Sequence, residues 1–130
     1  MFVEAKGEDM RAVAIVRDPH TGMNKTESAY ADRLELLKGA GEIIDWSFQP
    51  EKLRLSYSSV PGKKAASGPA FYTPDFRVQA SDGTIEFHET KGHWRTAAKV
   101  RIRVAADLHP MFRFVAVYKE KTGWKLEEIT

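Results

Sequence analysis

The order of apolar and polar positions along the 130-residue chain predicts two helices separated by strands. In the first helical segment, residues 25–38, the apolar side chains of Tyr30, Leu34 and Leu37 recur at helical spacing. Asn24 lies directly before this segment and is a suitable N-cap. We therefore expect a helix with one buried stripe.

A second helix is predicted over residues 96–108, and the proline at position 110 would end it. Part of this segment, residues 100–104, also alternates like a strand. In the helical interpretation the apolar residues gather on one face, which comprises Ala97, Val100, Val104 and Leu108.

The remaining apolar segments predict an antiparallel hairpin and further strands. The hairpin turn is Ser81-Asp82-Gly83, a strong turn signal between two strands. Together these elements predict an α/β (α+β) fold in one domain over residues 1–130, with a central mixed sheet flanked by helices. Residues 1–23 are the least patterned, and residues 58–69 predict a flexible surface loop. The expected strands cover residues 43–48, 52–57, 70–80, 84–91, 112–118 and 124–129.

The composition narrows the class of protein. The chain contains no cysteine, which excludes disulfide scaffolds, thiolate metal sites and cysteine nucleophiles. Hydrophobic residues make up 42%, which excludes a disordered tail, and no apolar run approaches the ~20 residues that span a bilayer. The amino-terminal segment lacks the pattern of a secretory signal, so we expect a cytoplasmic protein with no membrane partner. The net charge of +2 permits nucleic-acid binding without arguing for it.

Four charged residues lie where the pattern predicts helix or strand: Glu27, Asp75, Glu89 and Lys91. Charges inside otherwise apolar strands are unfavourable in a core. Two carboxylates that converge repel each other unless a cation lies between them, and Mg²⁺ is the cation that carboxylate oxygens suit. Glu89 and Lys91 are two residues apart in a strand, so they face the same side. The lysine could then orient a water or stabilise charge on a phosphate.

These residues resemble the signature of the PD-(D/E)XK nuclease superfamily. Pro74-Asp75 is followed 14 residues later by Glu89-Thr90-Lys91, which matches the signature residue for residue. The run from Asn24 to Glu27 and the segment Tyr72-Thr73-Pro74-Asp75-Phe76 are similar to small phage and prophage members of that superfamily. The likeness covers roughly residues 24–118.

The resemblance implies a restriction-endonuclease-like core and Mg²⁺-dependent cleavage of DNA, with Mn²⁺ able to substitute. The implied metal ligands are Asp75, Glu89 and the backbone carbonyl of Thr90. Lys91 would be the catalytic lysine, and Glu27 would complete the site. A structure-selective role is expected, on junctions, flaps or other intermediates of replication or recombination, in the cytoplasm of the host cell.

The register of the hairpin decides whether Asp75 and Glu89 can share a metal. A two-residue turn at Asp82-Gly83 would pair Asp75 with Thr90 and place the two carboxylates on opposite faces. One extra residue is needed, either as a bulge at Gly83 or as a break in the ladder beside Pro74. The apolar match across the hairpin favours the second alternative, so we expect a broken ladder at Pro74-Asp75.

Several basic residues are candidates for contacts with the DNA backbone. Arg95, Lys99 and Arg103 recur at intervals of four and would line one helix face, although an ordinary solvated face is an equal alternative. His88 should face away from Glu89, and a structural role is favoured for it. The full set of expected DNA contacts is Lys25, Lys63, Lys64, Arg95, Lys99 and Arg103.

Alternatives remain open. Glu27 is also explained as half of a capping box with Asn24. The chain could be a DNA-binding accessory protein that keeps a nuclease scaffold, or a nuclease subunit of a larger recombination or transposition complex. An active enzyme would be expected to form a homodimer, because a duplex presents two strands to cut. Phage replication or recombination proteins are further candidate partners.

Overall fold

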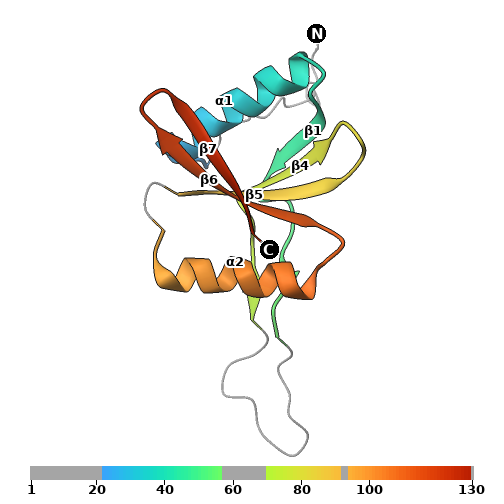
Figure 1. Cartoon of the computed structure of the whole chain (residues 1–130), viewed down its shortest axis with the longest axis vertical. Coiled ribbons are helices and arrows are strands. Elements are labelled where there is room, and N and C mark those ends of the chain that lie inside the picture. The colour runs from blue at the N-terminus through green and yellow to red at the C-terminus, as the bar shows by residue number, and fades with distance from the viewer. Residues whose placement is uncertain (1–21, 57–69, 92–93, 130) are drawn as a thin grey trace, which may run out of the picture.

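A five-stranded sheet lies between two helices, which cover its opposite faces (Figure 1). The structure is a computed structural model that describes residues 22–56, 70–91 and 94–129. It has a mixed α+β fold, as the sequence predicts. The elements are α1 Lys25–Gly39, β1 Ile43–Phe48, β2 Leu53–Arg54, β3 Phe71–Tyr72, β4 Phe76–Ala80, β5 Ile85–Lys91, α2 Thr96–Leu108, β6 Arg113–Glu120 and β7 Gly123–Ile129.

The strands of the main sheet follow the order β1-β4-β5-β6-β7. β5 and β6 run parallel, whereas the other neighbours are antiparallel. Parallel neighbours require a crossover connection, and α2 is that connection. The prediction of a central mixed sheet with an antiparallel hairpin is confirmed.

Helix α1 forms where the sequence predicts it. Asn24 and Glu27 make a reciprocal capping box, with hydrogen bonds of 2.8 and 2.9 Å. Tyr30 and Leu34 are buried against the sheet, as the predicted stripe requires. Among the described residues, no helix is long and apolar enough to cross a membrane.

Helix α2 has the predicted bounds, but the expectation about its apolar face is wrong. The side that packs on the sheet carries Ile102 and Ala105, which are buried. Val100 and Leu108, which belong to the predicted face, are 55% and 50% exposed. The helix is apolar on two sides. The side that carries Ile102 and the small side chain of Ala105 is the one that packs on the sheet. Periodicity alone cannot choose between two such stripes.

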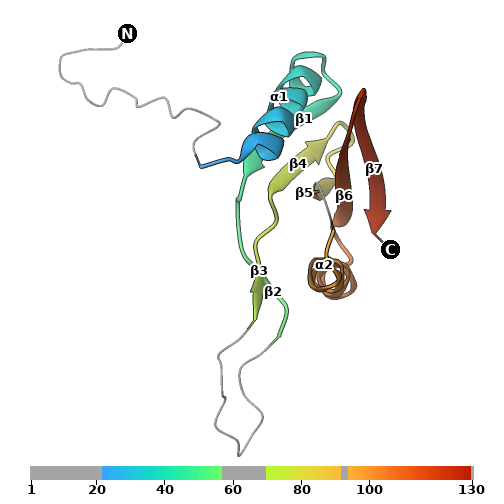
Figure 2. The same ribbon diagram turned by 90° about the vertical axis from the view of Figure 1, so that its left-hand side faces the viewer.

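The predicted strand over residues 70–80 is two separate strands. Pro74, which has no N–H to donate to a ladder, is fully buried between them. The first part, β3, pairs with β2 in a small sheet that extends away from the main one (Figure 2). The predicted strand over residues 52–57 is correspondingly reduced to β2. Residues 1–21 and the predicted loop, with Lys63 and Lys64, lie outside the described residues.

The hairpin between β4 and β5 corrects the predicted register. Phe76 pairs with His88, and this register continues to a loop of three residues between Ala80 and Thr84. Gly83 adopts a φ of +90°, the left-handed conformation that such a loop requires. The extra residue of the hairpin is therefore the bulge at Gly83. The apolar match had favoured a break beside Pro74 instead. The expected break beside Pro74 is also present, because the β4–β5 ladder ends at Phe76.

The apolar match misled because both faces of the sheet are buried. Phe76 and Val78 pack with Tyr30 of α1. Phe87 of the neighbouring strand packs on the other face with Ile102 of α2. When helices cover both faces, apolar residues of paired strands need not share a side.

Candidate functional site

Asp75 and Glu89 converge where β4 begins beside β5. Both residues are 7% exposed. The backbone N–H of Asp75 donates to Oε1 of Glu89 at 3.0 Å, and the hydroxyl of Tyr72 donates to the same oxygen at 2.8 Å. The corrected register places these two residues opposite each other just beyond the last pair of the ladder. The two carboxylates that the sequence singled out are thus brought together.

Each carboxylate is held through one of its two oxygens. Oδ2 of Asp75 accepts hydrogen bonds from the backbone N–H of Thr90 at 2.9 Å and from its hydroxyl at 3.0 Å. Oε1 of Glu89 takes both of the bonds described above. Within the described residues, no hydrogen bond reaches Oδ1 of Asp75, and the only partner of Oε2 of Glu89 is Lys91. Among the described residues, the second oxygen of Asp75 therefore accepts no hydrogen bond, and the second oxygen of Glu89 contacts only the partly exposed Lys91.

The electrostatics of this pair are unfavourable without a cation. Burial, followed by the charge of Glu89, raises the pKa of Asp75 to about 7. The hydrogen bonds from Thr90 oppose this rise, and the charge of Glu27 adds to it. The pKa of the Tyr72 hydroxyl is also raised, first by burial and then by the charge of Glu89. Asp75 and Glu89 thus bring two negative charges together where little solvent reaches them.

Lys91 is the one cation in direct contact with these carboxylates among the described residues. Its Nζ lies 3.3 Å from Oε2 of Glu89, and its side chain is 35% exposed. The prediction that Glu89 and Lys91 face the same side of the strand is confirmed. The ammonium group therefore contacts a buried carboxylate while its side chain remains partly open to solvent.

The backbone of Thr90 also faces the site. Its N–H donates to Asp75, so it points to the side of β5 on which β4 lies. The β4–β5 ladder has already ended at this point. The N–H and C=O of one strand residue point to the same edge of the strand. The Thr90 carbonyl therefore points toward Asp75, where it is available as a third oxygen ligand. The hydroxyl of Thr90, which bonds Asp75, is a site group that the sequence did not identify.

Glu27 is not part of this cluster. Its side chain is engaged in the capping box with Asn24, so that alternative explanation of the residue is confirmed. Among the described residues, no group of three or more His, Cys, Asp or Glu side chains could hold a metal ion. Glu27 nevertheless lies near enough for its charge to act on Asp75.

The donor set fits a hard divalent cation. Two buried carboxylates lie together, and burial followed by the charge of Glu89 raises the pKa of Asp75. Mg²⁺ binds one or two carboxylates and keeps several waters, so two ligands and a backbone carbonyl are sufficient. Asp75, Glu89 and the Thr90 carbonyl are therefore the residues that would hold it.

The predicted basic face of α2 is divided between two pockets. Arg95 lines one pocket together with Lys91 of the site, whereas Lys99 and Arg103 line another on the β6–β7 side. Arg101, which the sequence reasoning did not select, lines the pocket beside Lys91. No signal in the sequence identifies Arg101 until the buried face of α2 is known. Lys25 lies exposed at the start of α1.

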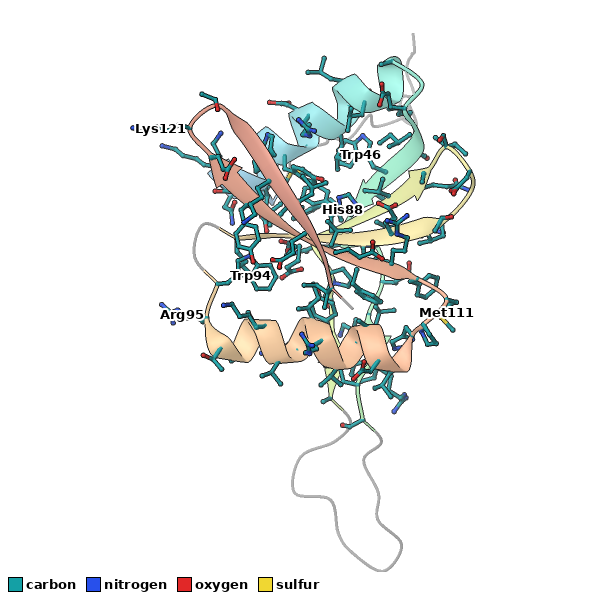
Figure 3. The ribbon with its side chains drawn as sticks, in the orientation of Figure 1. Trp46, His88, Trp94, Arg95, Met111 and Lys121 are labelled. Carbon is teal, nitrogen blue, oxygen red and sulfur yellow. The ribbon has the colours of Figure 1, made fainter. Side chains whose placement is uncertain are left out.

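On the opposite face of the sheet, His88 lies in a separate buried network (Figure 3). Its Nδ1 lies 2.6 Å from the hydroxyl of Tyr30, and its Nε2 lies 2.9 Å from Oε1 of Glu86. One arrangement of protons satisfies every group: Tyr30 donates to Nδ1, and Nε2–H donates to Glu86. The prediction that His88 faces away from Glu89 is confirmed.

Comparison with known proteins gives a family and no activity. The profile of a family described as "Protein of unknown function (DUF1064)" matches residues 8–124. No curated protein and no solved structure matches the chain.

Proposed function

Because the chain belongs to the DUF1064 family, whose description gives no function, we propose an activity from the site itself: metal-dependent hydrolysis of DNA phosphodiester bonds by an endonuclease. One observation carries the proposal. Two buried carboxylates converge, each with one oxygen fixed by hydrogen bonds, and a lysine lies 3.3 Å from the second oxygen of Glu89. A site that only needed to be stable would not bury two carboxylates side by side.

The roles of the residues follow from their contacts. A bound Mg²⁺ would polarise a phosphoryl oxygen and lower the pKa of a coordinated water. Asp75 and Glu89 would hold the ion. Thr90 and Tyr72 fix the two carboxylates so that they do not rotate away. Lys91 would orient the attacking water or stabilise negative charge on the phosphate. In the hydrolysis, the water oxygen bonds to phosphorus, the bond to one sugar oxygen breaks, and that oxygen takes up a proton.

The arrangement of the elements supports a restriction-endonuclease-like core. An amino-terminal helix, an antiparallel hairpin that carries Asp75 and Glu89, and a helical crossover to a parallel strand follow each other in the chain. This is the order that the resemblance to PD-(D/E)XK nucleases implies. Within that class we propose a structure-selective enzyme that acts on junctions, flaps or replication intermediates, and that works as a homodimer.

A DNA-binding accessory protein is the second candidate. The observation that favours it is that only two acidic side chains converge in the described part of the chain. Such a protein would bind DNA without cutting it and would not respond to Mg²⁺.

The test is cleavage of linear duplex, single-stranded, flap and four-way-junction DNA in Mg²⁺, Mn²⁺ or EDTA. We compare the wild type with Glu89→Gln and with the control Glu86→Gln, which changes a carboxylate on the same strand but the opposite face. Metal-dependent cleavage that Glu89→Gln abolishes and Glu86→Gln retains is the expected result. A folded wild type that binds DNA and cuts none of the four substrates in either metal would instead favour the accessory protein.

A further inference from the structure

A basic pocket lies directly beside the candidate site. It has a volume of about 280 Å³ and is formed by the end of β5 and the first half of α2. Its lining comprises Lys91, Arg95, Ala97, Ala98 and Arg101. Of the described residues that line it, three are cationic and none is acidic, and Lys91 is shared with the carboxylate site.

The two arginines of this pocket are available to a ligand. Within the described part of the chain, neither Arg95 nor Arg101 forms an ion pair. Both are exposed, and Arg95 extends outward from the amino-terminal end of α2 (Figure 3). Unpaired cations around one pocket repel each other, which an anion would relieve.

Arg101 is also electrostatically connected to the site. Its positive charge lowers the pKa of Tyr72, the residue whose hydroxyl donates to Glu89. Arg101 therefore lies near enough to act electrostatically on the site as well as on an anion in the pocket.

The other side of α2 differs in character. The pocket that Lys99 and Arg103 line has a volume of about 260 Å³. It also contains Glu127 and the apolar side chains of Trp94 and Ile129. This mixed lining does not favour a phosphate. Because Arg101 and Arg103 are two residues apart on a helix, their side chains point to different sides, and each lines a different pocket.

We propose that the pocket of Lys91, Arg95 and Arg101 binds a backbone phosphate of the DNA strand next to the bond that is cut. This inference rests on the proposed function, because it takes DNA as the substrate. Arg101 acts as a positioning residue: it holds the neighbouring phosphate and so places the scissile one beside Lys91 and the metal site that Asp75 and Glu89 would form. The DNA strand then follows the β5 side of α2, and Lys99 and Arg103 lie off its path.

The test compares Arg101→Ala with the matched control Arg103→Ala, which removes the same charge from the other side of the same helix. Binding of a fluorescent DNA junction is measured in EDTA at several salt concentrations, and both variants are checked for an unchanged melting temperature. We expect Arg101→Ala to weaken binding about tenfold and to reduce the salt slope by about 1. Arg103→Ala should change binding less than about threefold, and Arg101→Lys should restore part of the affinity.

Cleavage kinetics separate this inference from the proposed function. If the chain is a nuclease, Arg101→Ala raises KM more than it lowers kcat. Equal effects of Arg101→Ala and Arg103→Ala on binding, with metal-dependent cleavage intact, would overturn the phosphate site and leave the nuclease standing. An effect of Arg101→Ala alone in a protein that never cuts DNA would overturn the nuclease and retain the phosphate site.

Discussion

The two faces of the central sheet bury polar groups in opposite ways. On the α1 face, His88 is flanked by the hydroxyl of Tyr30 and the carboxylate of Glu86, so that each ring nitrogen has a partner. On the α2 face, Glu89 lies beside a second buried carboxylate, Asp75. His88 and Glu89 are adjacent residues of β5 whose side chains point to opposite faces of the sheet. Burial of a polar group is therefore not in itself a sign of a binding site; a stronger sign is a buried charge that lies beside another of the same sign.

The largest effect should come from removing the cation of the α2 face. We expect Lys91→Ala to lower metal-dependent DNA cleavage about 1000-fold, which corresponds to about 4 kcal/mol, because it removes charge stabilisation at the phosphate. Single-turnover cleavage measures the loss. The control Lys121→Ala removes a lysine from the β6–β7 turn (Figure 3), which forms no ion pair with Asp75 or Glu89 in the described part of the chain, and should cleave at the wild-type rate. Equal activity of the two variants would contradict the assigned role.

The charged form of the buried Asp75 carboxylate should lower the free energy of unfolding. The pKa of Asp75 is raised from 3.8 to about 7, so between these values the folded chain binds a proton that the unfolded chain does not. This group therefore stabilises the fold at pH 4, and that contribution is lost as the pH rises to 7. In EDTA at pH 8, Asp75→Asn should be more stable than the wild type by about 2 kcal/mol, and at pH 4 the difference should vanish.

Denaturant unfolding at pH 4, 6 and 8 checks this prediction, and Asp45→Asn supplies a control of opposite sign. The backbone N–H of Trp46, followed by the side chain of Lys38, lowers the pKa of Asp45. That carboxylate therefore stabilises the fold above its ordinary pKa, and its removal should lower stability at pH 8. Mg²⁺ should raise the melting temperature of the wild type and not that of Asp75→Asn. Parallel pH curves for the wild type and Asp75→Asn would remove the electrostatic argument.

The same chemical change can be made on each face, because each buried polar group has a tyrosine as a hydrogen-bond partner. His88 has Tyr30, and Glu89 has Tyr72. Tyr30→Phe leaves Nδ1 of His88 without its partner in the α1 network. We expect a loss of about 1.5 kcal/mol in the free energy of unfolding, with DNA cleavage unchanged. Tyr118→Phe, which removes an exposed hydroxyl 3.2 Å from Glu127, should have no measurable effect on stability. Reduced cleavage by folded Tyr30→Phe would mean that the two faces are coupled.

The smallest effect is expected for the tyrosine on the α2 face. Tyr72→Phe removes one of the two hydrogen bonds that fix Oε1 of Glu89. Cleavage should fall three- to tenfold, about 1 kcal/mol, because the carboxylate is less firmly oriented. Mg²⁺ titration of cleavage should show a weaker apparent affinity. Unchanged Mg²⁺ dependence would show that the hydroxyl has no role in holding the site.

Local sequence signals predicted most of the elements correctly. The bounds of α2 are the predicted ones, and α1 with its capping box at Asn24 also agrees, because both depend on neighbours within a few turns. The pairing of Glu89 with Lys91 followed from the two-residue period of a strand. These predictions needed no knowledge of tertiary contacts.

The predictions that failed depended on contacts distant in the sequence. The register of the hairpin was misjudged because Phe76 and Phe87 pack against different helices, α1 and α2. The buried side of α2 was misjudged because its pattern offers two apolar stripes. Arg101 and the hydroxyls of Tyr72 and Thr90 could not be assigned to the site before these packing choices were known.

The division between the two faces also separates the tryptophans of the chain. Trp46 and Trp124 pack in the α1 cluster, whereas Trp94 belongs to the α2 cluster, with its ring 6.0 Å from that of Tyr118. Tyr118 is the strand partner of Lys91. A protein with Trp46→Phe and Trp124→Phe would therefore keep a single tryptophan, on the face that carries the carboxylates. Its emission could report occupancy of that face in real time, without an attached dye.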